Sequence, residues 1–249
     1  AQSNWGLPLA DEILPQKLPV AYRCHAIGKW DLGHFTWSYV PFFRGFRSFL
    51  GHYGPYVDYD THETFDTLKC PGVADDADCL GRVANECHGT LRDFNFDGAA
   101  TPDADGDYST DVFAKRAVDL IAKEAPKHPV FLYVAFNAAH APLAADDAVV
   151  ADFAAAFLPE GRRARATFAA VTLLMDRAVE TVVDALRAVD GAYENSIICF
   201  ASDNGALPGQ VGGGSNWPLR GQKFSSFDGG VRVPAFVHSP LLAPSKRGG

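Results

Sequence analysis

Several residues that can do metal, anion-binding or acid–base chemistry follow apolar segments of the chain. Asp203 and Asn204 come directly after IICFAS, His140 comes after PVFLYVAFNAA, and Lys29 closely follows Ala26 and Ile27. A carboxylate beside an amide carbonyl provides oxygen donors that suit a hard cation such as Ca²⁺ or Mg²⁺. Lysine and histidine can hold an oxyanion and protonate a departing oxygen. The residues therefore predict a metal-assisted site for an anionic substrate.

A long glycine-rich loop follows the Asp-Asn pair and carries two cationic residues, Arg220 and Lys223, before the next apolar run begins. Loops of this length without regular structure are uncommon in compact domains and are usually functional or disordered. Glycines allow backbone conformations that other residues resist, so the loop can fold back over a bound anion. We expect Lys223 to contact the anion and Arg220 to stabilise the loop.

Apolar periodicity identifies the elements that position these residues. Residues 164–189 carry apolar side chains at three- and four-residue steps, which predicts a helix, and residues 110–125 predict another with Ser109 or Thr110 as its N-cap. A short helix is expected over residues 7–18. Strands are predicted within residues 19–30, 129–137, 196–202 and 231–239, with 129–137 buried. Helices alternating with strands indicate an α/β fold whose ligands bind at the carboxyl ends of the strands.

The bulk composition disfavours several classes of protein. A content of 47% hydrophobic and 21% charged residues is ordinary for a globular chain of 249 residues. The net charge of −8 argues against a nucleic-acid partner or an anionic membrane surface, so a bound anion is expected to be small. The sequence has no apolar run of the roughly 18 residues that a membrane span needs, and no secretory signal is visible in it.

The cysteines and the remaining histidines carry weaker signals. The chain has five cysteines, so at least one is free or paired outside it. Cys24 and Cys199 lie in apolar runs and are expected to be buried thiols. Two of the three cysteines in the Asp-rich loop either form a disulfide or stay free, and a zinc site there is disfavoured because no close C-x-x-C pair exists. These loop cysteines are Cys70, Cys79 and Cys87. Four histidines are interpreted as solvated loop residues: His34, His52, His62 and His88.

Five segments of the chain match a known family in order and spacing. They are GKWDLG, YSTDVFAKRA, FLYVAFNAAHAPL, TLLMDRAVETV and SDNG followed by GGGSNWPLRGQKFSSFDGGVRVPAFVHSPLL. The chain resembles the type I sulfatases, nearest the arylsulfatase B (N-acetylgalactosamine-4-sulfatase) branch, from about Leu7 to Leu242. The resemblance implies an alkaline-phosphatase-like α/β sandwich with a mostly parallel central sheet flanked by helices. It also implies hydrolysis of sulfate esters, of sulfated sugars or aryl sulfates, in a secreted or lysosomal protein.

The resemblance assigns roles to individual residues. Asp203 and Asn204 match half of a calcium site, for which Mg²⁺ is the alternative ion. Lys223 matches the lysine that holds the sulfate and polarises the leaving oxygen, and His140 matches the histidine that helps to protonate it. Lys29 matches the lysine of the G-K-W-H-L-G motif, which contacts sulfate and the nucleophile.

Two departures from the family pattern stand out. Asp31 occupies the place of the motif's histidine, which assists the nucleophile, and it adds negative charge near an anionic substrate. No cysteine or serine begins the C/S-x-P-x-R motif from which the family makes its formylglycine nucleophile. We therefore expect residues 1–249 to be an internal part of a sulfatase domain, incomplete at both ends. The formylglycine is expected in an upstream segment, and this chain by itself is expected to show little turnover.

Two other functions remain open at this level. One is a phosphatase or phosphodiesterase of the same superfamily, which also joins metal, lysine and histidine at strand ends. The other is a non-catalytic sulfate- or glycan-binding protein, or an inactive sulfatase-like protein, which Asp31 and the absent nucleophile motif favour. The oligomeric state is not predictable from these features.

Overall fold

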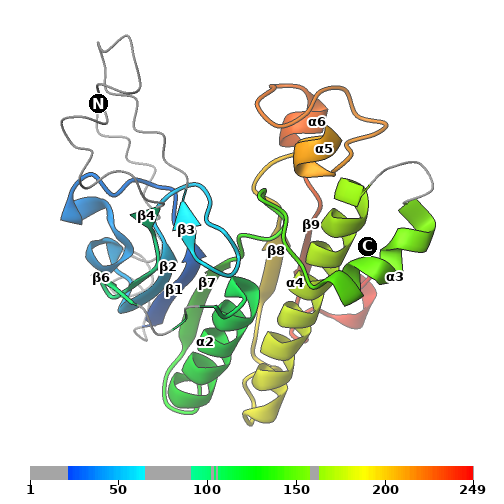
Figure 1. Cartoon of the computed structure of the whole chain (residues 1–249). Helices are drawn as coiled ribbons and strands as arrows, with labels where there is room; N and C mark the ends of the chain where they lie inside the picture. The colour runs from blue at the N-terminus through cyan, green and yellow to red at the C-terminus, as the bar shows by residue number, and fades with distance from the viewer. Residues whose placement is uncertain (1–21, 65–90, 102–103, 105, 158–162, 249) are drawn as a thin grey trace, which may run out of the picture.

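The computed structural model describes residues 22–64, 91–101, 104, 106–157 and 163–248. Its strands are β1 (Arg23–Lys29), β2 (Ser48–His52), β3 (Glu63–Thr64), β4 (Leu91–Arg92), β5 (Asn95–Phe96), β6 (Ala99–Ala100), β7 (Val130–Ala135), β8 (Ile198–Ala201) and β9 (Ala235–His238). Its α-helices are α2 (Ser109–Glu124), α3 (Asp147–Phe157), α4 (Arg163–Ala188), α5 (Gly209–Gly212) and α6 (Asp228–Val231). Short 3₁₀ helices are η2 (Trp37–Tyr39), η3 (Pro41–Arg44) and η5 (Pro244–Lys246). The elements are arranged as Figure 1 shows.

The main sheet is mixed and mostly parallel. Its strand order is β6-β5-β2-β1-β7, and β1 pairs in parallel with both β2 and β7, while β5 and β6 add antiparallel pairs. Strands β8 and β9 form a separate antiparallel pair, and β3 and β4 form another. The predicted strands all occur, although each is shorter than its apolar run because the ends of the runs lie in loops.

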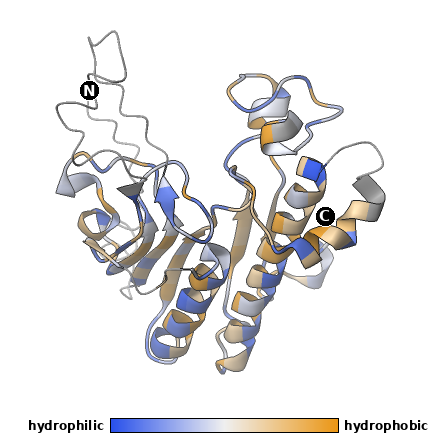
Figure 2. Cartoon of the chain, in the orientation of Figure 1, coloured by the Kyte–Doolittle hydropathy of each residue, from blue (hydrophilic) through white to orange (hydrophobic). Residues whose placement is uncertain are grey.

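Both faces of β1 are covered, which fixes the centre of the fold. Ile27 on one face packs with Phe113 and Leu120 of α2, and Val182 of α4 packs against the same cluster. The opposite face buries Cys24 and Ala26 with Trp30, Phe46 and Phe49. Helices α2 and α4 lie side by side and carry hydrophilic residues on their outer surfaces (Figures 1 and 2). None of the described helices is long and apolar enough to cross a membrane.

The amphipathic helix predicted over 164–189 is confirmed as α4, whose buried residues include Val171 and Ala178. The helix predicted over 110–125 is confirmed as α2, but its predicted cap is wrong. Tyr108 occupies the N-cap without a side-chain cap bond, and Ser109 and Thr110 are buried in the first turn. Ser109 instead exchanges hydrogen bonds with the Asn137 side chain, at 3.0 and 3.2 Å, so tertiary contacts decide where the helix begins.

The predicted burial of the strand within 129–137 and of Cys199 is wrong, in both cases because the strand has few neighbours among the described residues. Every residue of β7 is half-buried, because β7 is the last strand of the main sheet in the described part of the chain. Cys199 is exposed, because β8 pairs only with β9 among the described strands and its alternate residues face outward. Cys24 is buried as predicted. The helix expected over residues 7–18, the three loop cysteines and His88 lie outside the described residues.

Candidate active site at the strand ends

Lys29 lies at the carboxyl end of β1, where the backbones of β1 and β7 come very close. Gly28 has a positive φ of 93°, and a Cβ at this position would lie 1.9 Å from the carbonyl oxygen of Ala135 in β7. Only glycine fits this approach. The ammonium group of Lys29 then lies 3.4 Å from Asp203 Oδ2 and 3.6 Å from Asp31 Oδ2. The predicted strand ends therefore meet at one rim.

His140 is held just beyond β7 by a buried tyrosine. The hydroxyl group of Tyr59 donates to the carbonyl oxygens of Asn137 at 3.1 Å and His140 at 3.0 Å. The backbone N–H of His140 donates to the carbonyl oxygen of Asn137, and the ring of Tyr56 stacks on the imidazole with centroids 5.9 Å apart. Because hydrogen bonds hold its backbone and Tyr56 stacks on its ring, the imidazole has a defined orientation. Sequence patterns did not identify Tyr59 as a supporting residue.

The glycine-rich loop folds back on itself, and Asn216 ties it together. The Asn216 side chain accepts a hydrogen bond from the Ala206 N–H at 2.7 Å and donates one to the Ala206 carbonyl at 2.9 Å. The same carbonyl accepts the backbone N–H of Lys223 at 3.1 Å. A Cβ on Gly205 would lie 1.9 Å from the Gly229 carbonyl oxygen, so glycine permits this fold too. The loop thereby returns Lys223 to the strand ends.

Lys223 and His140 form the centre of the site. Lys223 Nζ lies 2.8 Å from His140 Nε2, while His140 Nδ1 lies 2.5 Å from the Ala141 carbonyl oxygen. A carbonyl oxygen can only accept, so Nδ1 carries the hydrogen and Nε2 accepts a hydrogen bond from the Lys223 ammonium group. This arrangement assigns the neutral tautomer and leaves Nε2 as the nitrogen that can exchange a proton.

The site lowers the pKa of both central groups. Burial is the main cause of the lowered pKa of His140, and the positive charges of Lys223 and Lys29 lower it further. Burial also lowers the pKa of Lys223, again with a contribution from Lys29. Asp203 opposes both shifts because a nearby carboxylate favours the cationic forms. The positive charges of Lys29 and Lys223 therefore act on His140, and a bound anion would offset these charges.

Asp203 and Asn204 follow β8 as predicted, and they offer oxygen donors of the kind that Ca²⁺ and Mg²⁺ prefer. The donor chemistry fits a hard cation, but the number of donors does not complete a site. Calcium takes about six to eight oxygen ligands. Within the described part of the chain, no group of three or more His, Cys, Asp or Glu side chains is placed to hold a metal ion. These two residues would form one side of such a site.

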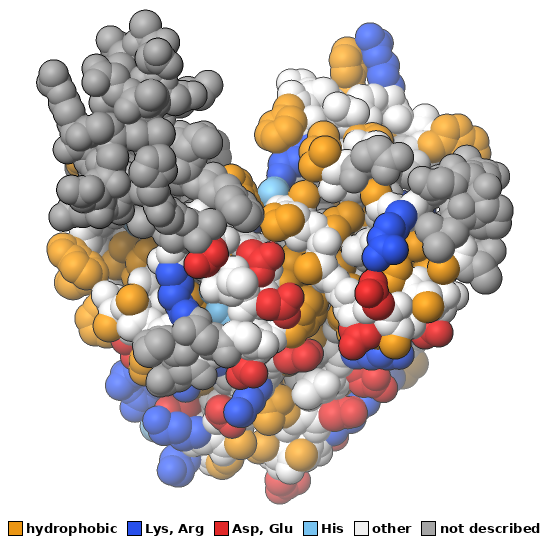
Figure 3. Space-filling view, viewed as in Figure 1, with side chains coloured by type: hydrophobic (Ala, Val, Ile, Leu, Met, Phe, Trp, Pro, Cys, Tyr) orange, Lys and Arg blue, Asp and Glu red, His pale blue; other side chains and the backbone are white. Residues whose placement is uncertain are grey.

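The structure brings together five of the predicted strand-end residues, and Asn204 follows one of them in the chain; the five are Lys29, Asp31, His140, Asp203 and Lys223. Asp31 has a positive φ of 46° and an exposed side chain that pairs with Lys29. Arg220 lies with its guanidinium group 3.8 Å from the ring centroid of Phe227 in the same loop. This contact agrees with the loop-stabilising role expected for Arg220. In the view of Figure 3, a histidine side chain and a basic side chain are seen next to each other below the part that carries α5 and α6 in Figure 1.

The prediction that four histidines are solvated loop residues is wrong for two of them. His34 is exposed, but His52 and His62 are fully buried. His52 closes β2 directly opposite Lys29 of β1, and its Nδ1 bonds to the Gly54 carbonyl oxygen at 3.0 Å. His62 stacks on Phe94 with centroids 4.1 Å apart. The stretch from Asp31 onward lacks a sustained apolar period, so its pattern does not indicate that these two rings are buried.

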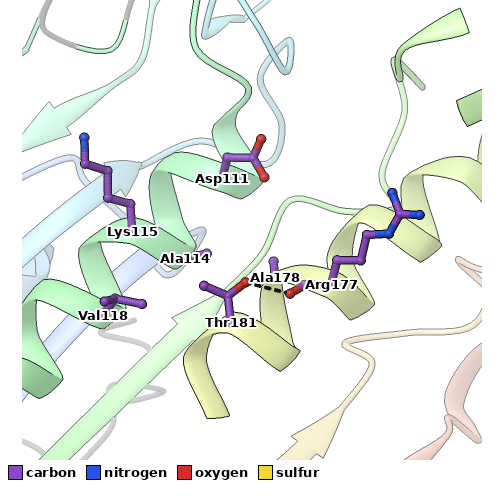
Figure 4. Close-up of a pocket in the computed structure, with 7 residues that line it drawn as sticks. All are labelled: Asp111, Ala114, Lys115, Val118, Arg177, Ala178 and Thr181. Carbon is purple, nitrogen blue, oxygen red and sulfur yellow. Dashed lines mark hydrogen bonds between the residues drawn. The ribbon is translucent and has the colours of Figure 1, made fainter. Parts of the chain in front are cut away.

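A surface groove lies elsewhere, between helices α2 and α4, with a volume of about 330 Å³ (Figure 4). Its lining includes Asp111 and Lys115 of α2 and Arg177 and Thr181 of α4. The hydroxyl group of Thr181 donates to the carbonyl oxygen of Arg177 within α4. None of the strand-end residues lines this groove, so the groove is separate from the chemical groups described above.

The sulfatase family model matches residues 1–247 of the chain. Among curated proteins, arylsulfatase J of Mus musculus is 39% identical over 237 residues, which cover 95% of this chain and 36% of that protein. N-acetylgalactosamine-6-sulfatase of Homo sapiens is 30% identical over 240 residues, which cover 94% of this chain and 41% of that protein. The chain thus spans less than half of the length of these two relatives.

Solved structures agree with this match. The structure of Ps i-CgsB in complex with k-i-k-neocarrahexaose has a TM-score of 0.70 and 30% identity, and the match covers 88% of this chain and 45% of that one. The likeness confirms the predicted alkaline-phosphatase-like α/β fold. Together with the family match over nearly the whole sequence, it means that this chain belongs to the sulfatase family.

Proposed function

We propose that the protein is a sulfuric ester hydrolase that removes sulfate from sulfated sugars, with Lys29, His140 and Lys223 at its reaction centre. The observation that carries this proposal is the contact between Lys223 Nζ and His140 Nε2, which joins an anion-binding group to a proton-exchanging group at 2.8 Å. Hydrolysis of a sulfate ester needs both functions, because the substrate is anionic and the departing oxygen must gain a proton.

Lys223 supplies the charge for binding the sulfate group. Among the described residues Lys223 makes no ion pair, and its ammonium group contacts only a neutral imidazole in hydrogen-bond range. Lys29, in contrast, is already balanced by Asp203 and Asp31. An incoming sulfate ester would therefore gain most from Lys223, with Lys29 as the second positive charge. Preorganised charge of this kind also stabilises the negative charge that develops on the reacting group.

His140 supplies the proton for the departing oxygen. Its Nδ1 is committed to the Ala141 carbonyl, so Nε2, on the side of Lys223, is the nitrogen that would take up a proton and deliver it. Burial and the two lysines lower its pKa, which makes the protonated form a stronger acid. The negative charge of a bound sulfate ester would counter those lysine charges and favour protonation when the substrate is present. Substrate binding and acid catalysis are thus coupled through one pair of residues.

Calcium, with Mg²⁺ as the alternative, and a formylglycine are part of the same proposal. Asp203 and Asn204 would hold the cation together with ligands from outside the described residues, and the cation would neutralise charge on the sulfate group. The formylglycine, as the hydrate of its aldehyde, would supply the nucleophilic hydroxyl group. A direct test of the metal is the calcium affinity of Asp203→Ala in the complete gene product, where unchanged affinity would refute the assignment.

The proposed substrate class rests on two relatives. One is named for the 6-sulfate of N-acetylgalactosamine, and the other was solved with a carrahexaose, an oligosaccharide. We extend this class to the present chain because its own cationic pair suits the sulfate group of such a sugar. A secreted or lysosomal location belongs to the proposal as well, and subcellular fractionation of the tagged complete gene product would test it.

The experiment is hydrolysis of N-acetylgalactosamine 6-sulfate, an aryl sulfate and the matching phosphate esters by the complete gene product. We expect sulfate release, and a loss on the order of 10²- to 10⁴-fold in kcat/KM in His140→Ala and Lys223→Ala. Lys246→Ala, a change at an exposed lysine near the C-terminal end of the chain, is the matched control and should keep full activity. Cleavage of phosphate esters alone would instead support a phosphatase. Sulfate binding without turnover in the wild-type protein would support the non-catalytic alternative.

A further inference from the structure

Phe224 has a conspicuous position beside the proposed reaction centre. It directly follows Lys223, and its ring centroid lies 5.4 Å from Lys223 Nζ. The side chain is 87% exposed, although an aromatic ring normally gains stability from burial. Lys223 in turn contacts His140. A large apolar ring is therefore held in water next to the group that would bind the sulfate.

The backbone of Phe224 is unusual as well. Its φ of 74° lies in the left-handed region, which bulky side chains rarely adopt. The neighbouring backbone fixes this conformation, because the Lys223 N–H donates to the Ala206 carbonyl and the Ser225 N–H donates to the Gln222 carbonyl. Strained conformations of this kind persist where the surroundings impose them, and they concentrate at ligand-binding positions. The exposure of the ring and the strain of its backbone are independent observations that point to the same residue.

The chemistry of a sugar sulfate matches this arrangement. The face of an aromatic ring carries partial negative charge. The C–H groups on one face of a pyranose carry partial positive charge, so the two faces stack. A sulfate group held by Lys223 leaves its sugar ring one ester linkage away, on the scale of the 5.4 Å between Lys223 Nζ and the Phe224 ring. The ring and the ammonium group can therefore contact the two parts of one substrate.

We propose that Phe224 is a sugar-stacking residue, which binds the pyranose ring that carries the sulfate group and thereby selects sulfated sugars over smaller sulfate esters. This inference rests on the proposed function, because it needs the sulfate group at Lys223. It adds a subsite for the sugar that Lys29, His140 and Lys223 do not provide. Phe224 does not touch the reacting atoms in this proposal, so its effect falls on substrate affinity.

The test compares two probes in calorimetric titrations of the complete gene product: N-acetylgalactosamine 6-sulfate and inorganic sulfate. We expect Phe224→Ala to weaken the binding of the sugar sulfate by about tenfold, the size of effect that one lost aromatic contact produces. Inorganic sulfate does not reach the ring, so its affinity should be unchanged. Phe224→Tyr keeps the aromatic face and should restore sugar binding. Phe42→Ala, which removes an exposed phenylalanine from η3, is the matched control and should leave both affinities unchanged.

A stability measurement separates stacking from a structural role. Glycine adopts a positive φ without strain, so Phe224→Gly should raise the melting temperature by about 2 °C. It should also weaken the binding of the sugar sulfate as much as Phe224→Ala does. If Phe224 instead had a structural role, Phe224→Gly would lower the melting temperature. Equal affinity of Phe224→Ala and wild type for the sugar sulfate, with inorganic sulfate still bound, would overturn the inference and leave the proposed function standing. Failure of the wild-type protein to bind either probe would overturn both.

Discussion

Lys223 Nζ lies 2.8 Å from His140 Nε2 and joins residues 83 positions apart in the chain. The contact links the glycine-rich loop after β8 to the turn after β7. It depends on Asn216 for the path of the loop and on Tyr59 for the position of the histidine. The charge of one partner and the proton affinity of the other are therefore connected, and this connection can be measured.

Replacing Lys223 by methionine should raise the pKa of His140. The Lys223 charge is one cause of the lowered pKa, after burial, so its removal should return the pKa part of the way toward 6.5. The measurement is an NMR titration of the His140 Cε1–H signal, assigned by its loss in His140→Gln. Lys246→Met is the control and should leave the titration unchanged. A lower His140 pKa in Lys223→Met would contradict the electrostatic link.

Neutralising Asp31 should strengthen anion binding. Asp31 pairs with Lys29 at 3.6 Å and adds negative charge to the rim of the site. Asp31→Asn keeps the size of the side chain, and asparagine tolerates the positive φ of this position. The Asp31 side chain is 46% exposed, so screening limits the gain to about twofold to fivefold in the affinity for inorganic sulfate.

Calorimetry at low and high ionic strength tests this prediction, because the gain should shrink as salt screens the exposed charge. Asp184→Asn removes an exposed carboxylate from α4 that pairs with Arg187, and it should leave sulfate affinity unchanged. Weaker binding in Asp31→Asn would mean that Asp31 positions Lys29 for the anion and that this contribution exceeds the repulsion.

Much of this site could be anticipated from the sequence, because strand ends are easy to locate. Lys29, His140 and Asp203 each follow an apolar run. The parallel pairing of β1 and β7 brings the strand ends before Lys29 and His140 to one edge, whereas Asp203 follows β8, which pairs with the antiparallel β9. Lys223 is far from these residues in sequence, and its return to the site was predicted from the glycines of the loop and from the family resemblance. The helix α4 was predictable because its apolar period extends over many turns.

Other features depend on tertiary contacts that leave no periodic signal. The Asn216 side chain pairs with a backbone amide ten positions away, and Tyr59 reaches carbonyl groups near His140. The burial of His52 follows from its place opposite Lys29 in a central strand pair, in a region that reads as loop. The half-burial of β7 reflects which strands lie next to it, and an apolar run does not specify its neighbours.

Removing the Asn216 side chain should loosen the loop that carries Lys223. Asn216→Ala deletes two hydrogen bonds to Ala206, so we expect a loss of about 1–3 kcal/mol in the free energy of unfolding. Hydrogen exchange should show faster exchange of the Ala206 and Lys223 amides, and sulfate affinity should fall with it. Asn195→Ala is the control, because Asn195 makes a side-chain bond to the Gly191 carbonyl after α4. Unchanged protection of the Lys223 amide would show that the glycines alone hold the loop.

Three buried histidines should make the fold sensitive to acid. Burial is the main cause that lowers the pKa values of His25, His52 and His62 from 6.5 to about 4. Between these values the unfolded state binds more protons than the folded state, so the free energy of unfolding falls as the pH drops from 6.5 toward 4. Above pH 6.5 this contribution to stability is fully present. At pH 5 one such histidine accounts for on the order of 2 kcal/mol.

Urea unfolding at pH 7 and pH 5 measures this loss, and His25→Gln tests one of its sources. Glutamine can still bond Ser48, which His25 Nδ1 contacts at 2.7 Å, but it does not titrate. The variant should therefore lose roughly 1–2 kcal/mol less than wild type between the two pH values, whatever its stability at pH 7. His34→Gln changes an exposed histidine and should lose as much as wild type. Equal losses in His25→Gln and wild type would mean that His25 becomes protonated without unfolding, so that the strand pair β1–β2 admits a charged imidazole.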